Sequence, residues 1–189
     1  MVATAVKTSV LALSGSLRKA SYNTALLRAA RELAPEGMTV EIYTLERIPP
    51  FNLDLENDMP PAVLELKEKI READGLLFGT PEHNYSIPGV LKNAIDWASR
   101  PPVKVPFLRK PAAIIGASTG QMGTARSQYH LRQVLVCLDM FVMNRPEIFV
   151  GMAEGKFDAE GSLSDEETRG RLAKMLAAFA GWIAFHSRA

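Results

Sequence analysis

The sequence is poor in cysteine and has no excess of charge of either sign. Its 189 residues include a single cysteine, Cys137, so no disulfide can form within the chain, which suits a reducing compartment. Cys137 stands among Leu135, Val136 and Leu138, where we expect a buried, unreactive thiol. Lysine and arginine number 22 against 21 acidic residues, a balance that gives no support to nucleic-acid or membrane binding.

Long apolar runs are also lacking. No stretch is long enough to cross a bilayer, and the early run from Val10 to Leu13 is too short for a secretory signal. We therefore expect a soluble cytoplasmic protein. The length suits one core without a linker, which predicts a single domain over residues 1–189.

Several kinds of catalytic site lack their motifs. His83, His130 and His186 are too scattered for a zinc site, no acidic cluster suggests a divalent metal, and no G-x-S-x-G turn occurs. His130 and His186 fall within helical segments, where packing or surface roles are expected. The sequence offers no catalytic acid or base, so any chemistry is expected to come from a cofactor.

Short apolar runs alternate with segments of helical period, as in a parallel sheet with crossover helices. This pattern predicts an α/β, flavodoxin-like, doubly wound five-stranded parallel sheet of order 2-1-3-4-5 flanked by helices. The predicted strands are Ser9–Leu13, Thr39–Tyr43, Gly75–Gly79, Ala112–Ala117 and Pro146–Val150. The predicted helices are Asn23–Leu33, Ala62–Ala73, Pro88–Ala98, Ala125–Met140 and Asp165–His186, and a long surface loop spans Ile48–Pro61.

The loop after the first predicted strand, Ser14–Thr24, has the features of an anion site. It leads into a helix N-terminus, it is rich in short polar side chains, and Arg18 adds a planar charged group suited to phosphate oxygens. Gly15 is its only glycine, and it lacks both G-x-G-x-x-G and a Gly-Lys-Ser/Thr ending, which favours the terminal phosphate of a mononucleotide. The alternative is a polar loop that merely caps the helix.

Two further loops are expected to face the same crevice, because parallel strands end at one edge of a sheet. Thr80–Gly89 is stiffened by Pro81 and Pro88 and could present backbone groups to a flat heterocycle, or could be simply a rigid turn. Gly116–Arg126 holds three glycines that allow close approach to a ligand, although glycine-rich loops before helices are common.

These loops carry a resemblance to a known family. GSLRKASYN at residues 15–23, TPEHNYSIPGVLKNAIDW at 80–97 and GASTGQMGTAR at 116–126 resemble the NADPH-dependent FMN reductases, with their bacterial chromate or quinone reductase and azoreductase-like relatives. The resemblance runs over nearly the whole chain. It implies bound FMN, NAD(P)H as co-substrate, and a homodimer or homotetramer, for which the helix Pro88–Ala98 and the segment Gln121–Met140 are the candidate interface.

The resemblance also implies site residues. Ser16, Arg18 and Asn23 would bind the FMN phosphate, Pro81 to Tyr85 would line the isoalloxazine ring, and Ser118 would border the flavin. Many relatives have Tyr where this chain has His83. Glu82 is expected to make a main-chain or surface contact. The full set of candidate cofactor contacts is Ser16, Leu17, Arg18, Asn23, Thr24, Pro81, Glu82, His83, Asn84, Tyr85 and Ser118, with no metal ligand.

The predicted function is hydride transfer from NAD(P)H through bound FMN to a small-molecule acceptor. Quinones, chromate, azo compounds and free flavin stay open as acceptors, as does the choice between NADH and NADPH. The alternative functions are a flavodoxin-type electron carrier or a flavin-based redox sensor without turnover. Carriers usually work through an acidic face, which the near-neutral balance of charge does not favour.

Overall fold

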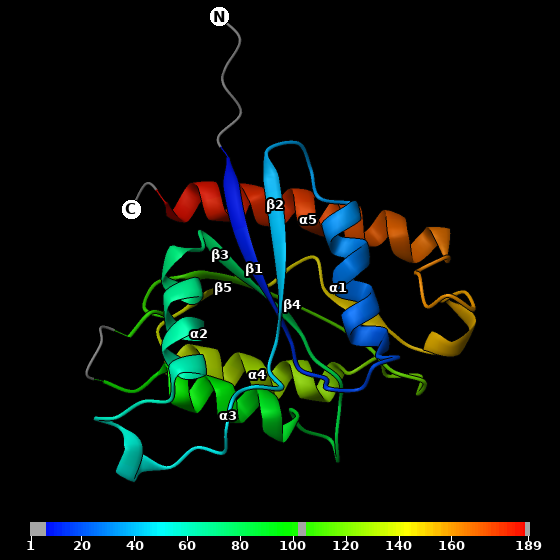
Figure 1. Cartoon of the computed structure of the whole chain (residues 1–189). Helices are drawn as coiled ribbons and strands as arrows, with labels where there is room; N and C mark the ends of the chain where they lie inside the picture. The colour runs from blue at the N-terminus through cyan, green and yellow to red at the C-terminus, as the bar shows by residue number, and fades with distance from the viewer. Residues whose placement is uncertain (1–6, 102–104, 188–189) are drawn as a thin grey trace, which may run out of the picture.

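The computed structural model describes residues 7–101 and 105–187 (Figure 1). A six-stranded sheet forms the centre, in the order β2-β1-β3-β4-β5, with β6 also paired to β4. All of the strand pairs are parallel. The strands are β1 (Thr8–Ser14), β2 (Met38–Thr44), β3 (Gly75–Gly79), β4 (Pro111–Ala117), β5 (Phe141–Val142) and β6 (Ile148–Val150). The predicted order 2-1-3-4-5 is confirmed.

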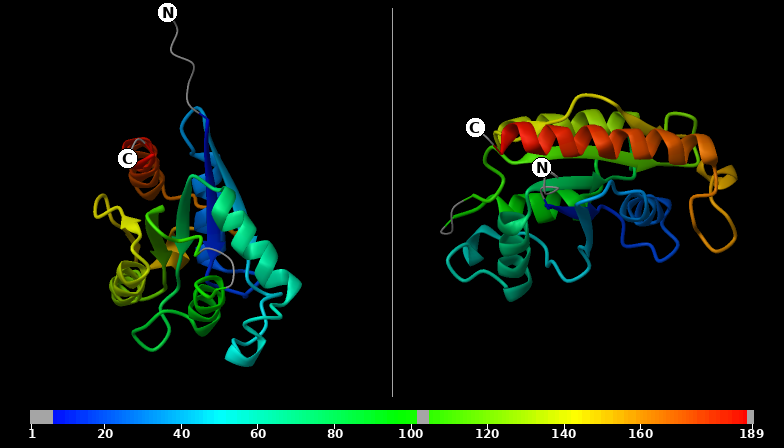
Figure 2. Two further views of the ribbon diagram at one scale, coloured as in Figure 1. Left: turned by 90° about the vertical axis from the view of Figure 1, so that its left-hand side faces the viewer. Right: turned by 90° about the horizontal axis from the view of Figure 1, so that it is seen from above.

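The helices cover both faces of the sheet, which explains why β3 and β4 are buried and apolar along their whole length. Figure 2 shows α5, in red, extending along the length of the molecule. No helix in residues 7–101 or 105–187 is both long and apolar enough to span a bilayer. The helices are α1 (Tyr22–Glu32), α2 (Pro61–Glu72), α3 (Gly89–Ala98), α4 (Ala125–Cys137) and α5 (Glu166–His186), with short 3₁₀ turns η1 (Leu53–Leu55) and η2 (Ala153–Gly155).

Two apolar cores hold these layers together. One face of the sheet packs against α1 and α5, through residues such as Leu26 and Phe179. The other packs against α2, α3 and α4, through residues such as Ile70, Trp97 and Leu131. With a full core on each face, the groups exposed for chemistry are those at the strand ends.

Helix boundaries follow their capping residues. α1 begins after Ser21, whose hydroxyl accepts a hydrogen bond from the Thr24 N–H at 3.3 Å. α5 begins after Asp165, whose carboxylate accepts one from the Thr168 N–H at 2.9 Å. The Thr168 hydroxyl also donates to this carboxylate. The hydroxyl bond and, after it, the N–H bond hold the pKa of the Asp165 carboxyl below its usual range. The bounds of four of the five predicted helices agree with the observed bounds to within one residue at each end.

The fifth strand differs from its prediction. The sequence predicts one strand over Pro146–Val150, whereas the edge of the sheet is made by two short strands, β5 and β6. Phe141 pairs with Pro111 near the start of β4, and Ile148 pairs with Ile115 near its end. Pro146 lies between them, and because proline has no N–H to donate, an unbroken strand is disfavoured there.

α4 is shorter than predicted, and Cys137 is exposed rather than buried. The helix ends at Cys137, and Asp139 then takes a φ of 53°, which no helix accommodates. Leu131 and Leu135 are the buried leucines of α4. Cys137 lies two residues beyond Leu135, about 200° around the helix, and so faces solvent.

Candidate cofactor site

The loops after β1, β3 and β4 meet at the carboxyl ends of the strands and enclose a cavity of about 480 Å³. The cavity lies where the strand order reverses, because the chain passes from β1 outward to β2 and then returns to β3 on the other side. Its lining residues are Gly15, Ser16, Leu17, Arg18, Ser21, Tyr22, Asn23, Pro81, Glu82, His83, Pro88, Gly89, Val90, Ala117, Ser118 and Thr119.

Eight of the eleven predicted contacts line this cavity, and three do not. The eight are Ser16, Leu17, Arg18, Asn23, Pro81, Glu82, His83 and Ser118. The Thr24 hydroxyl lies 2.8 Å from that of Ser14, back toward β1. Asn84 and Tyr85 form the tip of a turn beside the cavity. Contact of any of the eleven with a cofactor stays a prediction.

The first loop presents donors without partners. Among the described residues, none accepts a hydrogen bond from the backbone N–H of Leu17, Tyr22 or Asn23. No carboxylate within residues 7–101 and 105–187 forms an ion pair with Arg18. The guanidinium carbon of Arg18 lies 5.9 Å from the centroid of the Tyr22 ring. Free N–H groups at the start of α1 and an unpaired guanidinium make an environment that favours an anion.

The side chain of Asn23 ties the first loop to the third. Its amide nitrogen donates to the Ala117 carbonyl at 2.9 Å, and its amide oxygen accepts from the Ala117 N–H at 2.9 Å. Asn23 is 4% exposed, so this two-point link is shielded from water. The side chain therefore fixes the end of β4 against α1, and the backbone N–H of Asn23 remains available to a ligand.

The second loop is held to α4 by a buried carboxylate. Glu82 accepts hydrogen bonds from the backbone N–H groups of Arg126 at 3.1 Å and Ser127 at 3.3 Å, and from Arg126 Nε at 2.6 Å. The Ser127 hydroxyl also donates to the Pro81 carbonyl at 2.9 Å. The Glu82 carboxylate thus caps α4, and its expected main-chain contact is confirmed.

A tight turn follows Glu82. His83 and Ser86 exchange two backbone hydrogen bonds of 3.0 and 2.9 Å, and the two residues between them, Asn84 and Tyr85, both have positive φ, at 50° and 66°. A bulky residue such as Tyr85 rarely takes this conformation. Its ring lies 3.9 Å from the Arg126 guanidinium carbon, a contact that supports the turn from the side of α4.

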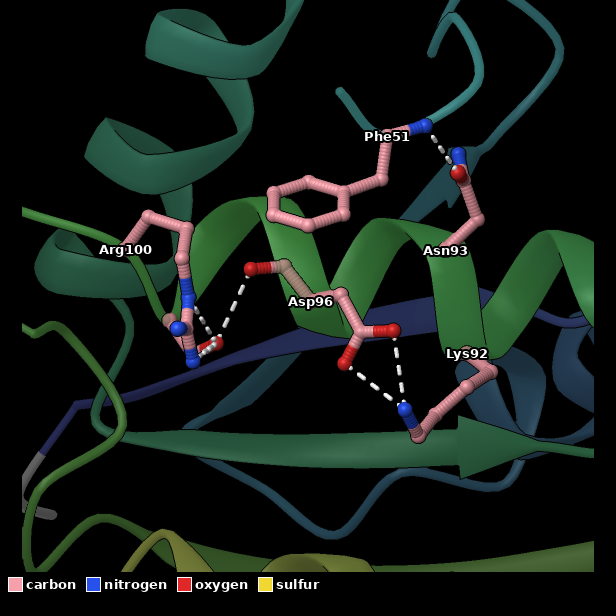
Figure 3. Close-up of polar contacts among 6 residues, drawn as sticks. Phe51, Lys92, Asn93, Asp96 and Arg100 are labelled. Atoms are coloured by element: carbon pink, nitrogen blue, oxygen red, sulfur yellow. Dashed lines mark hydrogen bonds and ion pairs between the residues drawn. The ribbon is translucent and has the colours of Figure 1, made fainter. Parts of the chain in front are cut away.

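The second half of the 80–97 motif is structural. Asn93 of α3 accepts from the Phe51 N–H at 2.7 Å and donates to the Pro49 carbonyl at 2.9 Å, and Trp97 Nε1 donates to the same carbonyl at 2.9 Å. Figure 3 shows Asn93 turned toward Phe51, with the ion pair between Lys92 and Asp96 on the same helix. These residues anchor the long loop after β2 to α3.

Sequence reasoning missed the wall formed by the start of α3. Pro88, Gly89 and Val90 line the cavity because the turn at residues 83–86 brings the α3 N-terminus back toward the first loop. The other lining residues that were not named as cofactor contacts belong to the first and third loops, which were expected to face the crevice: Gly15, Ser21, Tyr22, Ala117 and Thr119. Each of these residues lies at or near a predicted contact or a predicted helix start, and this position in the sequence could have identified it as part of the cavity lining.

The chain matches a family model and several known proteins. A model of the family described as NADPH-dependent FMN reductase matches residues 8–155. The chain is similar to an NAD(P)H-dependent FMN reductase of Pseudomonas aeruginosa, with 53% identity over 92% of this chain and 94% of the relative. It is also similar to a 2-hydroxy-1,4-benzoquinone reductase of a Burkholderia species, with 43% identity over 89% and 92% of the two chains.

A solved structure shows the same similarity in three dimensions. FerB of Paracoccus denitrificans, a flavoenzyme NAD(P)H:(acceptor) oxidoreductase, matches with a TM-score of 0.87 and 38% identity over 95% of this chain and 98% of that one. The predicted family is confirmed: the chain belongs to the NADPH-dependent FMN reductases.

Proposed function

We propose that the chain is an enzyme that binds FMN in the cavity at the carboxyl ends of β1, β3 and β4, and that it reduces a quinone at the expense of NAD(P)H. The observation that carries the proposal is a cavity of about 480 Å³ with unpartnered anion donors on one loop and a rigid turn on another. This volume is in the range of small-molecule and cofactor sites.

The residues present fit FMN. At the first loop, the N–H groups of Leu17, Tyr22 and Asn23 and the guanidinium of Arg18 would hold the phosphate. At the second and third loops, Pro81, His83 and Ser118 and their backbone would border the ring system. When bound, FMN supplies hydride transfer between NAD(P)H and the acceptor. The protein's own part is to fix the orientation of the flavin, and Glu82 and Asn23 do this by locking the loops together.

The proposal predicts that the purified protein is yellow and takes up FMN in preference to FAD. Steady-state oxidation of NADH and NADPH should depend on added benzoquinone, and chromate, an azo dye and free flavin serve as further acceptors in the same assay. Specificity follows from the kcat/KM values across this panel. A colourless protein that shows no FMN binding in a titration would refute the proposal, whereas bound FMN without turnover would indicate an electron carrier.

Arg18→Ala should weaken FMN binding. The substitution removes one or two charge-assisted hydrogen bonds to the phosphate, each worth roughly 1.5–3 kcal/mol, so the Kd should rise by at least about 10-fold. The measurement is quenching of flavin fluorescence on titration of apoprotein. Lys19→Ala is the matched control, because it removes the neighbouring positive charge from a residue outside the cavity lining. Equal effects of the two variants would contradict a phosphate contact by Arg18.

We also propose that copies of the chain associate through α4. Tyr129 and Val136 are seven residues apart on this helix and are 50% and 72% exposed, and Met122, in the turn before the helix, is 54% exposed. Residues at this spacing share one helix face, which gives an exposed apolar stripe. Light scattering should therefore give the mass of two or four chains.

A further inference from the structure

Four ionisable side chains line the cavity, and three of them have other roles in the geometry. They are Arg18, Tyr22, Glu82 and His83. A guanidinium does not give up its proton in proteins. The Glu82 carboxylate is occupied by three donors from the start of α4. The Tyr22 ring packs against that of Phe157 with centroids 5.0 Å apart, next to the proposed phosphate loop.

His83 differs from these three because its backbone is fixed while its side chain is free. Its N–H and carbonyl both bond to Ser86, and the turn is held from α4 by the contact of His130 Nδ1 with the Ser86 hydroxyl at 3.1 Å. The side chain of His83 is exposed. No hydrogen bond within residues 7–101 and 105–187 reaches the His83 imidazole. His83 thus lines the cavity and is also open to solvent.

Quinone reduction requires a proton as well as a hydride. When a quinone becomes a hydroquinone, both C=O double bonds become C–O single bonds, and the ring system takes up the electron pair of the hydride. One oxygen receives the hydrogen of that hydride, and the other is left as an oxyanion that takes a proton. Donation of this proton by a positioned side chain accelerates such a step by roughly 100- to 10,000-fold.

We propose that the His83 imidazolium is the general acid that delivers this proton to the quinone oxygen, becoming a neutral imidazole that solvent reprotonates. The inference rests on the proposed function, which supplies the hydride. Imidazole is suited to the role because it is the side chain whose charge normally changes between about pH 5 and 8. The charged and titratable groups around His83 are Arg18 and Tyr22, which line the same cavity, the Glu82–Arg126 pair and Tyr85 beside it, and His130 behind the turn.

The test compares two acceptors in the FMN-loaded protein. Benzoquinone requires a proton, whereas ferricyanide accepts single electrons and requires none. Protein reduced anaerobically with NADPH is mixed with each acceptor in a stopped-flow instrument, and rates are expressed per bound FMN. In His83→Gln, the ratio of the benzoquinone rate to the ferricyanide rate should fall about 100-fold relative to wild type. Asp96→Ala, which removes an ion pair on α3 outside the cavity lining, should leave that ratio unchanged.

The pH profile and chemical rescue give independent readouts. The wild-type benzoquinone rate should be higher at pH 6 than at pH 9, because only the imidazolium can donate a proton, and His83→Gln should lack this difference. In His83→Ala, added imidazole should restore the benzoquinone rate and not change the ferricyanide rate.

A binding measurement provides a readout that does not depend on turnover. 4-Nitrophenolate resembles the hydroquinone oxyanion, and its absorbance reports whether its oxygen carries a proton. At pH 6, oxidised wild-type protein loaded with FMN should bind it more tightly than His83→Gln, and the difference should shrink at pH 9. Equal affinity at both pH values would count against an imidazolium at the acceptor position.

The outcomes separate this inference from the function on which it rests. Equal losses with benzoquinone and ferricyanide would show that His83 only positions the flavin, and an unchanged ratio would show that the proton comes from solvent; either result overturns the inference alone. Failure of the wild-type protein to reduce any acceptor overturns the proposed function and the inference together.

Discussion

Gly116→Ala is expected to lower the free energy of unfolding by about 3 kcal/mol and to weaken FMN binding by disrupting the junction of two site loops. A β-carbon at Gly116 would lie 2.0 Å from Thr124 Oγ1 and 2.5 Å from the Thr80 carbonyl oxygen. The Thr124 side chain can rotate, but the Thr80 oxygen belongs to the backbone. Gly116 is itself fixed in β4, where it pairs with Phe149. Relief therefore requires the loop that begins at Thr80 to move away from β4.

Gly170→Ala provides the matched control for this prediction. Gly170 lies within α5 and has no atom within 4 Å of an added β-carbon. In that open position the same chemical change should stabilise the protein by about 0.4–1 kcal/mol, because alanine restricts the unfolded chain. Urea unfolding measures both variants, and FMN titration measures the effect on the site. If Gly116→Ala were as stable as the wild-type protein, the loop at Thr80 would be able to move away from β4 at little cost in free energy.

Much of the fold is visible in the sequence because its signals are local. β3 is an apolar run of five residues that is buried throughout, as a central strand covered on both faces should be. The start of α1 follows from Ser21, and that of α5 from Asp165. Pro146 is a local signal against an unbroken edge strand, but the pairing of Phe141 and Ile148 with opposite ends of β4 depends on the folded sheet. Cys137 was misjudged because apolar neighbours in sequence were taken to be neighbours in space.

The site was predictable to the extent that it follows from topology. Parallel strands end at one edge, so the loops at Ser16, Pro81 and Ser118 had to lie close together once the strands were identified. The direction of an individual side chain could not be predicted in the same way. The partners of Glu82 lie 44 and 45 residues further along the chain, and only the folded structure brings the α4 N-terminus to its carboxylate.

The position of this carboxylate makes it a structural element of the site. Its side chain is 9% exposed, whereas in every other ion pair among the described residues the acidic side chain is at least 30% exposed. One oxygen accepts from two backbone N–H groups that the start of α4 leaves without helical partners. The other binds Arg126, whose guanidinium also covers the Tyr85 ring. Loss of the carboxylate would release the helix start, the arginine and the turn together.

Glu82→Ala should therefore destabilise the protein by about 2–4 kcal/mol, because it leaves charged and backbone donors without an acceptor. FMN affinity should fall as well, since the loop that borders the flavin loses its attachment to α4. Asp96→Ala is the control, because it removes a half-exposed i,i+4 ion pair with Lys92 that should be worth no more than about 0.5 kcal/mol. Glu82→Gln keeps one acceptor oxygen and should fall between the two. If Glu82→Ala unfolds in urea like Asp96→Ala yet loses FMN, then Glu82 contacts the cofactor directly, and its role in capping α4 is secondary.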